Sequence, residues 1–133
     1  HVPLAAWIAF ARAMMVRDEP PETGIVTVLS EQGYIAGLCS YRIEPDLAHG
    51  RSLTAEPFLA VDMFDRLAVV HALADAIEAI ARAQRCDAVH TTLPEKRHRR
   101  GDGGLAFNLT DRGHQVDAMR LCKILPYRTQ TPR

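Results

Sequence analysis

The stretch from residue 59 to residue 93 decides the fold. It reads LAVDMF (59–64), DRLAVVHALADAIEAIARAQR (65–85) and, after one cysteine, DAVHTTL (87–93). The middle segment predicts an amphipathic helix, because residues recur in it at three- and four-residue steps. The recurring residues are Leu67, Val70, Ala74, Ile77, Ala81 and Gln84. Asp65 can cap the helix by accepting hydrogen bonds from the free first-turn amides. The flanking segments predict two parallel strands joined by a right-handed crossover.

Upstream of this unit, residues 3–17 predict a first helix, since apolar side chains again recur at helical steps. The recurring residues are Leu4, Trp7, Ile8, Ala11, Met14 and Met15. Of these, we expect Trp7, Met14 and Met15 to pack in the core. Residues 24–30 and 34–43 are rich in β-branched and apolar residues and predict a hairpin. Residues 45–50 predict a polar loop.

Residues 51–61 predict a third strand that contains Pro57. Because proline cannot donate to a sheet ladder, this strand must bulge, bend away or lie at an edge there. Downstream of the second parallel strand, residues 105–112 predict a short helix, which Gly113 can end in a left-handed conformation. Residues 115–125 predict the last strand.

The predicted fold class is therefore α+β, in three layers. The central sheet is mixed, with antiparallel and parallel strands, and the strand-helix-strand unit forms its core. We expect one domain over residues 1–133, with residues 126–133 as a loosely held tail. A chain of 133 residues is large enough to bury a core without disulfides or metal.

The composition is that of a globular protein, with 47% hydrophobic and 24% charged residues. Sixteen basic residues balance sixteen acidic ones, so no overall field draws the chain to nucleic acid or to an acidic membrane. No apolar run is long enough to span a bilayer, and no signal-peptide pattern follows His1. Cys39, Cys86 and Cys122 are odd in number and widely separated, which predicts buried thiols in a reducing cytoplasm.

Two places in the sequence carry a family resemblance. One is Leu59-Ala60-Val61, followed by Arg66 and the long alanine-rich helix. The other is Ala106-x-x-Leu109, with Asp111-Arg112 and Gly113 after it. Together with the order of elements over roughly residues 3–125, they resemble a divergent member of the GNAT superfamily of N-acetyltransferases.

The resemblance implies a V-shaped slot for acetyl-CoA or another acyl-CoA as cosubstrate. Backbone groups of Leu59, Ala60 and Val61 would pair with the pantetheine arm. The start of the long helix would hold the pyrophosphate, because helix N-terminal amides are unpaired donors at a positive dipole end. The residues implied there are Arg66, Leu67, Ala68, Val69, Val70 and His71.

The sequence departs from the family pattern at this phosphate loop. Val69 and His71 occupy the positions of the family's glycines. A β-branched valine is expected to obstruct a close backbone approach, and Asp62 and Asp65 add negative charge beside the phosphates. We expect weakened CoA binding, although a protonated His71 could restore some attraction.

The catalytic groups are less defined by the sequence. The family's usual acid, a tyrosine, is replaced by Leu109 or, with a one-residue deletion, by Thr110. Neither residue can protonate a leaving thiolate. Glu56 on the splaying strand is the candidate general base, and its alternative role is that of a solvent-facing strand residue.

Three further groups have alternative roles. The basic loop 96–100 could hold a phosphate of CoA or an acidic acceptor, or simply be solvated; without interleaved aromatic residues it does not predict specific nucleic-acid binding. His90 could shuttle protons or be a satisfied interior histidine. We predict no metal site, because no two histidines have metal spacing on one helix face.

The leading functional hypothesis is a CoA-dependent N-acyltransferase in which an amine acceptor attacks the bound thioester directly. Its alternative is a non-catalytic ligand-binding or interaction domain that has lost the phosphate glycines and the acid. A third hypothesis is a scaffold that forms a homodimer, for which the last strand would need an exposed apolar face.

Overall fold

The computed structural model describes residues 2–15, 22–61, 65–93, 109–117 and 122–123. Its elements are α1 (Leu4–Met14), β1 (Thr23–Leu29), β2 (Ile35–Asp46), β3 (Gly50–Ala60), α2 (Arg66–Ala83) and β4 (Ala88–Thr91). The strands form one sheet in the order β1-β2-β3-β4. The first three are antiparallel, and β4 runs parallel to β3.

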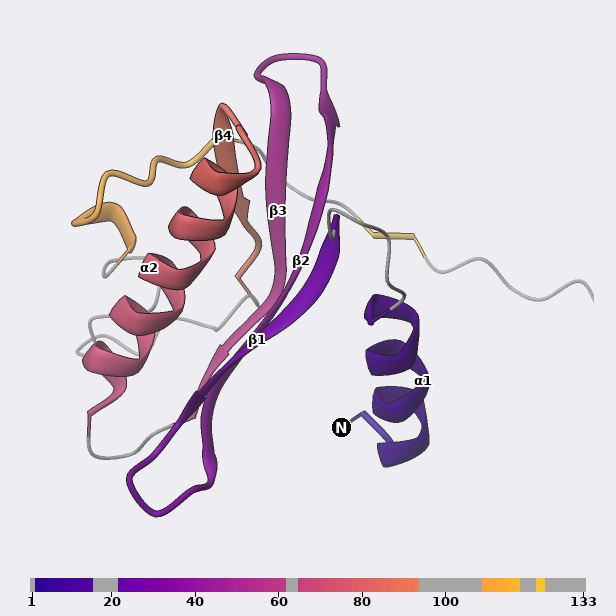
Figure 1. The fold of residues 1–133 in the computed structure, drawn as a ribbon, viewed down its shortest axis with the longest axis vertical. Coiled ribbons are helices and arrows are strands. Elements are labelled where there is room, and N and C mark those ends of the chain that lie inside the picture. Colours follow the sequence, from indigo (N-terminus) through magenta and orange to yellow (C-terminus); the bar gives the residue numbers. More distant parts are fainter. Residues whose placement is uncertain (1, 16–21, 62–64, 94–108, 118–121, 124–133) are drawn as a thin grey trace, which may run out of the picture.

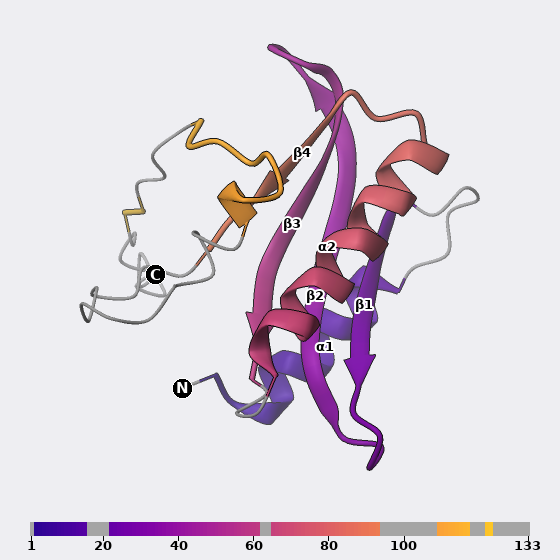
Figure 2. The ribbon, with the colours of Figure 1, turned by 90° about the vertical axis from the view of Figure 1, so that its left-hand side faces the viewer.

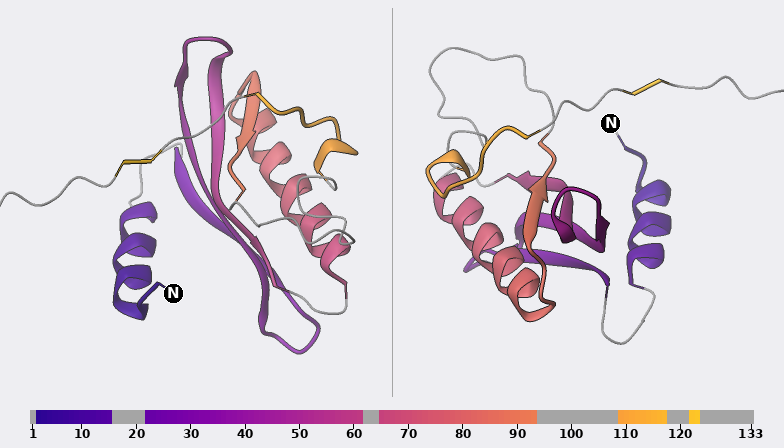
Figure 3. Two further views of the ribbon diagram at one scale, coloured as in Figure 1. Left: turned by 180° about the vertical axis from the view of Figure 1, so that it is seen from behind. Right: turned by 90° about the horizontal axis from the view of Figure 1, so that it is seen from above.

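The sheet lies between two helices, so the described chain has three layers. Figure 1 shows α2 on one side of the sheet and α1 on the other, and the view from above in Figure 3 shows the same order. In Figure 2, α2 crosses in front of the strands and covers their face. The predicted mixed sheet with its strand-helix-strand core is confirmed.

Helix α2 supplies most of the helical part of the core. The Asp65 carboxylate accepts a hydrogen bond from the Ala68 amide at 3.0 Å, which confirms the predicted cap. The buried residues of the helix are Val69, Val70, Leu73, Ala74, Ile77 and Ala81. Because Val69 and Leu73 belong to this set, the apolar stripe is rotated relative to the predicted one. Leu67 therefore lies at its margin and is 49% exposed.

Strand β3 bulges where the proline predicted it. Tyr41 of β2 pairs with Ala55, and Cys39 pairs with Phe58, so β3 carries one extra residue between these pairs. Pro57 lies in this irregular part, where its missing amide leaves no gap in the ladder.

The turn between β2 and β3 is tighter than the predicted loop. Pro45 and Asp46 belong to β2, where they pair with Arg51 and Gly50 of β3. A proline is tolerated there because the pairing of β1 with β2 ends at Arg42, so this end of β2 is an edge. The prediction of a loop from residue 45 was therefore wrong at both of its ends.

Helix α1 is less buried than its apolar stripe suggested. Met14 is buried and Thr23 donates its hydroxyl hydrogen to the Met14 carbonyl at 3.0 Å, which attaches the end of the helix to β1. Met15 is exposed, so the prediction that it packs in the core was wrong, and Leu4 and Ile8 of the same stripe are exposed as well. The reason is that α1 contacts the sheet mainly through β1, the edge strand.

After β4, the described residues resume at Leu109, the end of a helical turn. Gly113 has a φ of +91°, and the amides of Gly113 and His114 donate to Thr110 and Leu109. This is the predicted glycine stop, a Schellman motif. No strand forms at residues 115–117 or 122–123, where Val116 is 95% exposed, so the predicted last strand is not present in these residues.

Several predictions fall on other parts of the chain. The basic loop 96–100, the start of the short helix at 105–108, and the tail 126–133 lie outside the described residues. Among the helices that the structure describes, none combines the length and the apolarity that crossing a bilayer requires.

Candidate functional site

The first feature of the site is the divergence of β3 from β4. The two strands pair from Ser52 with Ala88 to Ala55 with Thr91, and the Thr92 amide donates to the Ala55 carbonyl at 3.1 Å. Strand β3 continues to Ala60, but β4 does not pair with it beyond this point. Among the described residues, the β4-facing edge of β3 is therefore open from the bulge onward.

The backbone groups that face this opening follow from the ladder with β2. The Val61 amide donates to the Ala36 carbonyl at 2.8 Å. Hydrogen-bonded pairs alternate along an antiparallel ladder, so the backbone of Ala60 points away from β2, toward the open edge. The amide of Val61 is already paired inside the sheet, so among Leu59, Ala60 and Val61 the donor on the open edge is Ala60.

The second feature is the start of α2, which follows β3 in the chain. The Ala68 amide is occupied by the Asp65 carboxylate. Nε of Arg66, the first residue of the helix, is buried and has no hydrogen-bond partner among the described residues. The helix start therefore offers a guanidinium donor and the amides of Arg66 and Leu67, beside the negative charge of Asp65.

The side chains along the first turns of α2 point in different directions. Leu67 and Ala68 are exposed, whereas Val69 and Val70 are buried in the core against the sheet. His71 is half-buried. The Val69 side chain lies in the core and does not extend outward from the helix start. The expected effect of this valine on the approach of a phosphate stays a prediction.

Glu56 lies at the bulge itself, where β3 leaves β4. Its side chain is half-buried, and its backbone carbonyl accepts a hydrogen bond from the buried Ser40 hydroxyl. The structure thus places the carboxyl-bearing residue at the mouth of the opening, while the contact with Ser40 fixes the backbone that carries it.

The third feature is a hollow on the α1 side of the sheet. It has a volume of about 200 Å³. Its lining comes from α1, β2 and β3 and consists of Trp7, Ile35, Gly37, Leu38, Leu59 and Val61. Trp7 is held edge to face on Phe10, with 5.8 Å between the ring centroids. The lining is apolar, so the hollow suits a hydrocarbon group rather than an ion.

The two positions that the resemblance gives for the family's tyrosine acid differ in exposure. Leu109 is 3% exposed and packs in the main cluster, and Thr110 is exposed. Of the tyrosines, Tyr41 is buried, which raises its pKa, and Tyr34 is exposed. Tyr127 lies outside the described residues. The two positions that the resemblance gives for the acid therefore carry no phenol.

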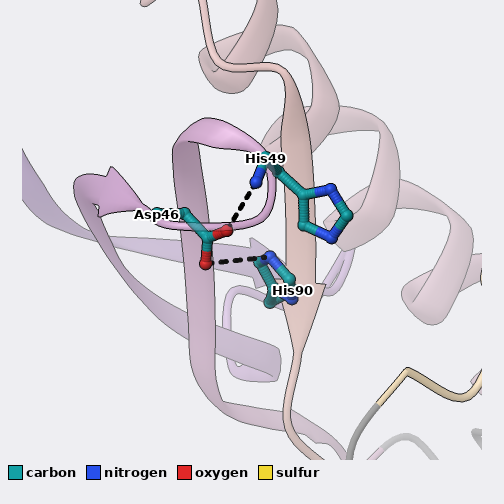
Figure 4. Close-up of side chains that lie close together, drawn as sticks. All are labelled: Asp46, His49 and His90. Carbon is teal, nitrogen blue, oxygen red and sulfur yellow. Dashed lines mark hydrogen bonds and ion pairs between the residues drawn. The ribbon is translucent and has the colours of Figure 1, made fainter.

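A fourth group of polar side chains gathers near the turn between β2 and β3 (Figure 4). Nitrogen and oxygen atoms of Asp46, His49 and His90 lie within 4.8 Å of one another. Nε2 of His90 is buried and has no hydrogen-bond partner within the described part of the chain, so there it is not the satisfied interior residue that was one of its two predicted roles. The sequence gives no signal for this group, because His49 belongs to a turn and His90 to β4.

Asp46 is the fixed member of this group. Its Oδ1 accepts the amides of His49 at 2.7 Å and of Ala48 at 2.9 Å. These hydrogen bonds, that of His49 first, stabilise the carboxylate and lower the pKa of Asp46. Its second oxygen, Oδ2, lies 3.8 Å from Nε2 of His90.

Comparisons with known proteins agree with this geometry. No protein-family model and no curated protein matches the sequence. Among solved structures, a transcriptional regulator from Bacillus halodurans C-125 has a TM-score of 0.70 at 15% identity, covering 93% of this chain and 77% of that chain. Glucosamine-6-phosphate N-acetyltransferase from Arabidopsis thaliana has a TM-score of 0.63 at 14% identity, covering 95% of this chain and 81% of that chain.

A third solved structure holds a ligand related to both substrates of an acetyl transfer. AAC(6')-Iy, in complex with the bisubstrate analogue CoA-S-monomethyl-acetylneamine, has a TM-score of 0.59 at 14% identity, covering 97% of this chain and 82% of that chain. Likeness at these identities is likeness of fold. With its mixed sheet, its diverging β3 and β4 and the α2 crossover between them, the chain has the fold of the GNAT N-acetyltransferases.

Proposed function

We propose that the protein is a CoA-dependent N-acyltransferase that moves an acyl group from acetyl-CoA, or another acyl-CoA, to an amine. The observation that carries this proposal is the opening of the β3 edge at the Glu56 bulge, immediately before the α2 crossover. An extended ligand with amide groups can add to an open strand edge as an extra strand would. Pantetheine is such a ligand.

The two ends of the cosubstrate would meet different groups. The pantetheine amides would pair with the backbone of Ala60, and the pyrophosphate would lie at the start of α2 against Arg66 and the first amides. Asp65 opposes the phosphates, because it carries a like charge and already occupies the Ala68 amide. The cosubstrate would therefore bind less tightly than at a helix start without this carboxylate.

The reaction would proceed without a covalent enzyme intermediate. The amine nitrogen attacks the thioester carbonyl, the C–S bond breaks, and CoA leaves as the thiolate. The amine loses a proton to Glu56, directly or through water, and the thiolate gains one from solvent. Holding the two reactants together accounts for much of the rate gain in such a transfer, and general-base catalysis adds about 10²–10⁴-fold.

The hollow on the α1 side suggests what the acceptor or the acyl group looks like. Trp7, Leu38 and Leu59 give it an apolar wall, and Leu59 precedes the open-edge residue Ala60 in β3. We propose that it takes an apolar part of one of the two substrates. If the hollow takes the acceptor, the acceptor of this chain would be less polar than glucosamine 6-phosphate, the substrate named for one neighbour in fold.

The experiment that tests the proposal is a binding titration of acetyl-CoA and desulfo-CoA by calorimetry. Arg66→Gln should weaken binding at least about tenfold, since it removes the charge that meets the pyrophosphate. Arg82→Gln is the matched control, because Arg82 lies at the other end of α2 and pairs with Glu78 on the surface. Absence of binding to the folded wild-type chain, or equal effects of both substitutions, would refute the slot.

Catalysis is tested separately with a panel of amines, by following release of free CoA. Glu56→Gln should lower kcat by about 10²–10⁴-fold and leave the acyl-CoA dissociation constant unchanged, if Glu56 is the general base. An unchanged kcat in this variant would remove Glu56 from the mechanism and leave the slot assignment intact.

A second candidate function is that of a non-catalytic binding or interaction domain. It is favoured by the burial of Leu109 at the position of the family's acid and by the Asp65 carboxylate at the helix start. It is also supported by a neighbour in fold that is named a transcriptional regulator. Binding of acyl-CoA without turnover of any amine would favour this function.

A further inference from the structure

The cluster of Asp46, His49 and His90 stands apart from the slot. Asp46 and His49 flank the turn between β2 and β3, and His90 lies on β4 beside Thr54. Strand β3 runs from this turn to the open edge at its other end, so the length of a strand separates the two places (Figure 1). The proposed acyl transfer uses none of these three side chains.

We infer that Asp46, His49 and His90 form a binding site for a zinc ion. Two imidazole nitrogens and one carboxylate oxygen are a ligand set that zinc takes in proteins, with further positions left for water or substrate. The three donor atoms lie within 4.8 Å of one another, and Oδ2 of Asp46 is 3.8 Å from Nε2 of His90. Ligands at about 2.0–2.2 Å from one ion come somewhat closer than this. Small side-chain rotations would close the set.

The unpartnered nitrogen of His90 points to a missing ligand. Nε2 is the atom that faces Asp46, and it is buried without a hydrogen-bond partner among the described residues. A buried polar atom without a partner costs free energy, so such atoms in native structures usually meet an ion or water. Figure 4 shows the His90 ring directed toward the Asp46 carboxylate, with the His49 ring beside it.

The other nitrogen of His90 has the partner that zinc-bound histidines usually have. Nδ1 lies 3.5 Å from Oδ2 of Asp117, a residue after the Gly113 stop. A histidine that binds zinc through one nitrogen commonly donates its other N–H to a carboxylate, which fixes the ring and raises its basicity. Asp117 would be that positioning residue. It also lies 3.9 Å from Nε2 of His49, so it serves the same cluster from a third segment.

The turn between β2 and β3 also orients Asp46 and His49 for binding an ion. The amides of Ala48 and His49 hold one oxygen of Asp46, which leaves the other oxygen directed to His90. The rings of His49 and His90 lie 5.3 Å apart between centroids. Because the His49 side chain is 41% exposed, it can rotate onto the ion without disturbing the core.

The chemistry of the donors selects the class of ion. Imidazole nitrogen favours zinc and the later first-row metals, whereas Mg²⁺ and Ca²⁺ prefer sets made only of oxygen. A bound ion would tie the turn after β2 to β4, and through Asp117 to the segment that follows the short helix. The site would therefore stabilise the end of the sheet that lies farthest from the slot.

The test uses the untagged full chain with Cys122→Ser, so that the exposed thiol does not bind the metal. Titration with ZnCl2 should show one ion per chain and a raised melting temperature, because an ion that binds only the native state stabilises it. MgCl2 at the same concentration should leave the melting temperature unchanged. Co²⁺ in place of Zn²⁺ should give the visible absorption bands of a low-coordinate nitrogen and oxygen site.

Variants separate this site from adventitious binding. His49→Ala lies in an exposed turn and should fold, yet lose zinc binding, and His90→Ala should do the same. Asp117→Asn should weaken binding by about 10–100-fold, as expected for a positioning residue. His114→Ala removes a histidine outside the cluster and should bind zinc like the parent chain. A parent chain that binds no zinc, or a His49→Ala chain that binds it equally well, would overturn the inference.

Discussion

Val69 on α2 occupies the space that a side chain on Gly37 would need. A Cβ built on Gly37 would lie 2.5 Å from Cγ1 of Val69 and 3.1 Å from Cδ1 of Leu73. The valine at the family's glycine position is thus a core residue that fits against a glycine of β2. A glycine at position 69 would open a cavity there, so restoring the family's pattern would test packing together with phosphate binding.

Gly37→Ala should destabilise the protein by about 1–3 kcal/mol, because the added methyl overlaps a buried side chain. Val69→Ala removes the overlapping methyl, so the double variant should be less destabilised than the sum of the two single variants. Urea unfolding of the four proteins measures this coupling. Ile80→Ala, about three turns along α2, should be additive with Gly37→Ala; equal coupling to both positions would contradict the contact.

Cys39 should be unreactive toward thiol reagents in the native protein. Burial raises the pKa of this thiol to about 12, so almost no thiolate is present at neutral pH. Cys122 is exposed, so the prediction that all three thiols are buried was wrong for this residue. It should be modified first, whereas Cys39 should react only as urea unfolds the chain. Mass spectrometry of peptides after timed alkylation gives the order. Rapid native modification of Cys39 would show that β2 opens locally.

Asp65→Asn should strengthen acyl-CoA binding. Asparagine caps a helix about as well as aspartate, so the hydrogen bond to Ala68 is retained while the charge that repels the pyrophosphate is lost. The dissociation constant should fall by roughly tenfold or less, as expected for a single partly screened charge. Glu44→Gln removes the same charge from an exposed position on β2 and should have no effect. A weaker complex in Asp65→Asn would place the pyrophosphate elsewhere.

The stability contributed by the Asp46 charge should depend on pH. The amides of His49 and Ala48 lower the pKa of this carboxyl in the folded chain relative to the unfolded one. Its contribution is therefore fully present above about pH 4 and is lost as the pH falls through the folded value. With a chelator present, Asp46→Asn should melt below the wild type at neutral pH. The difference should shrink in acid; a difference independent of pH would contradict this.

The strand-helix-strand unit was predictable because its signals are local. The three- and four-residue spacing of the apolar residues and the cap at Asp65 each depend on neighbours in the sequence. The same is true of the stop at Gly113, in the helical turn that follows the unit. Pro57 likewise imposes the bulge of β3 from its own covalent structure, since it has no amide to donate. The fold of the core, and hence the resemblance, followed from these features.

The sequence could not decide which side chains meet across elements. Tertiary packing puts Val69 against Gly37, leaves the apolar stripe of α1 largely in solvent, and pairs the Val61 amide inside the sheet. It also gathers His49 and His90 from a turn and a strand into one cluster. Such contacts depend on the register and twist of the assembled sheet, which no short window of sequence contains. The sequence by itself determined the order and the kind of the core elements, and the tertiary structure alone decided the contents of both candidate sites.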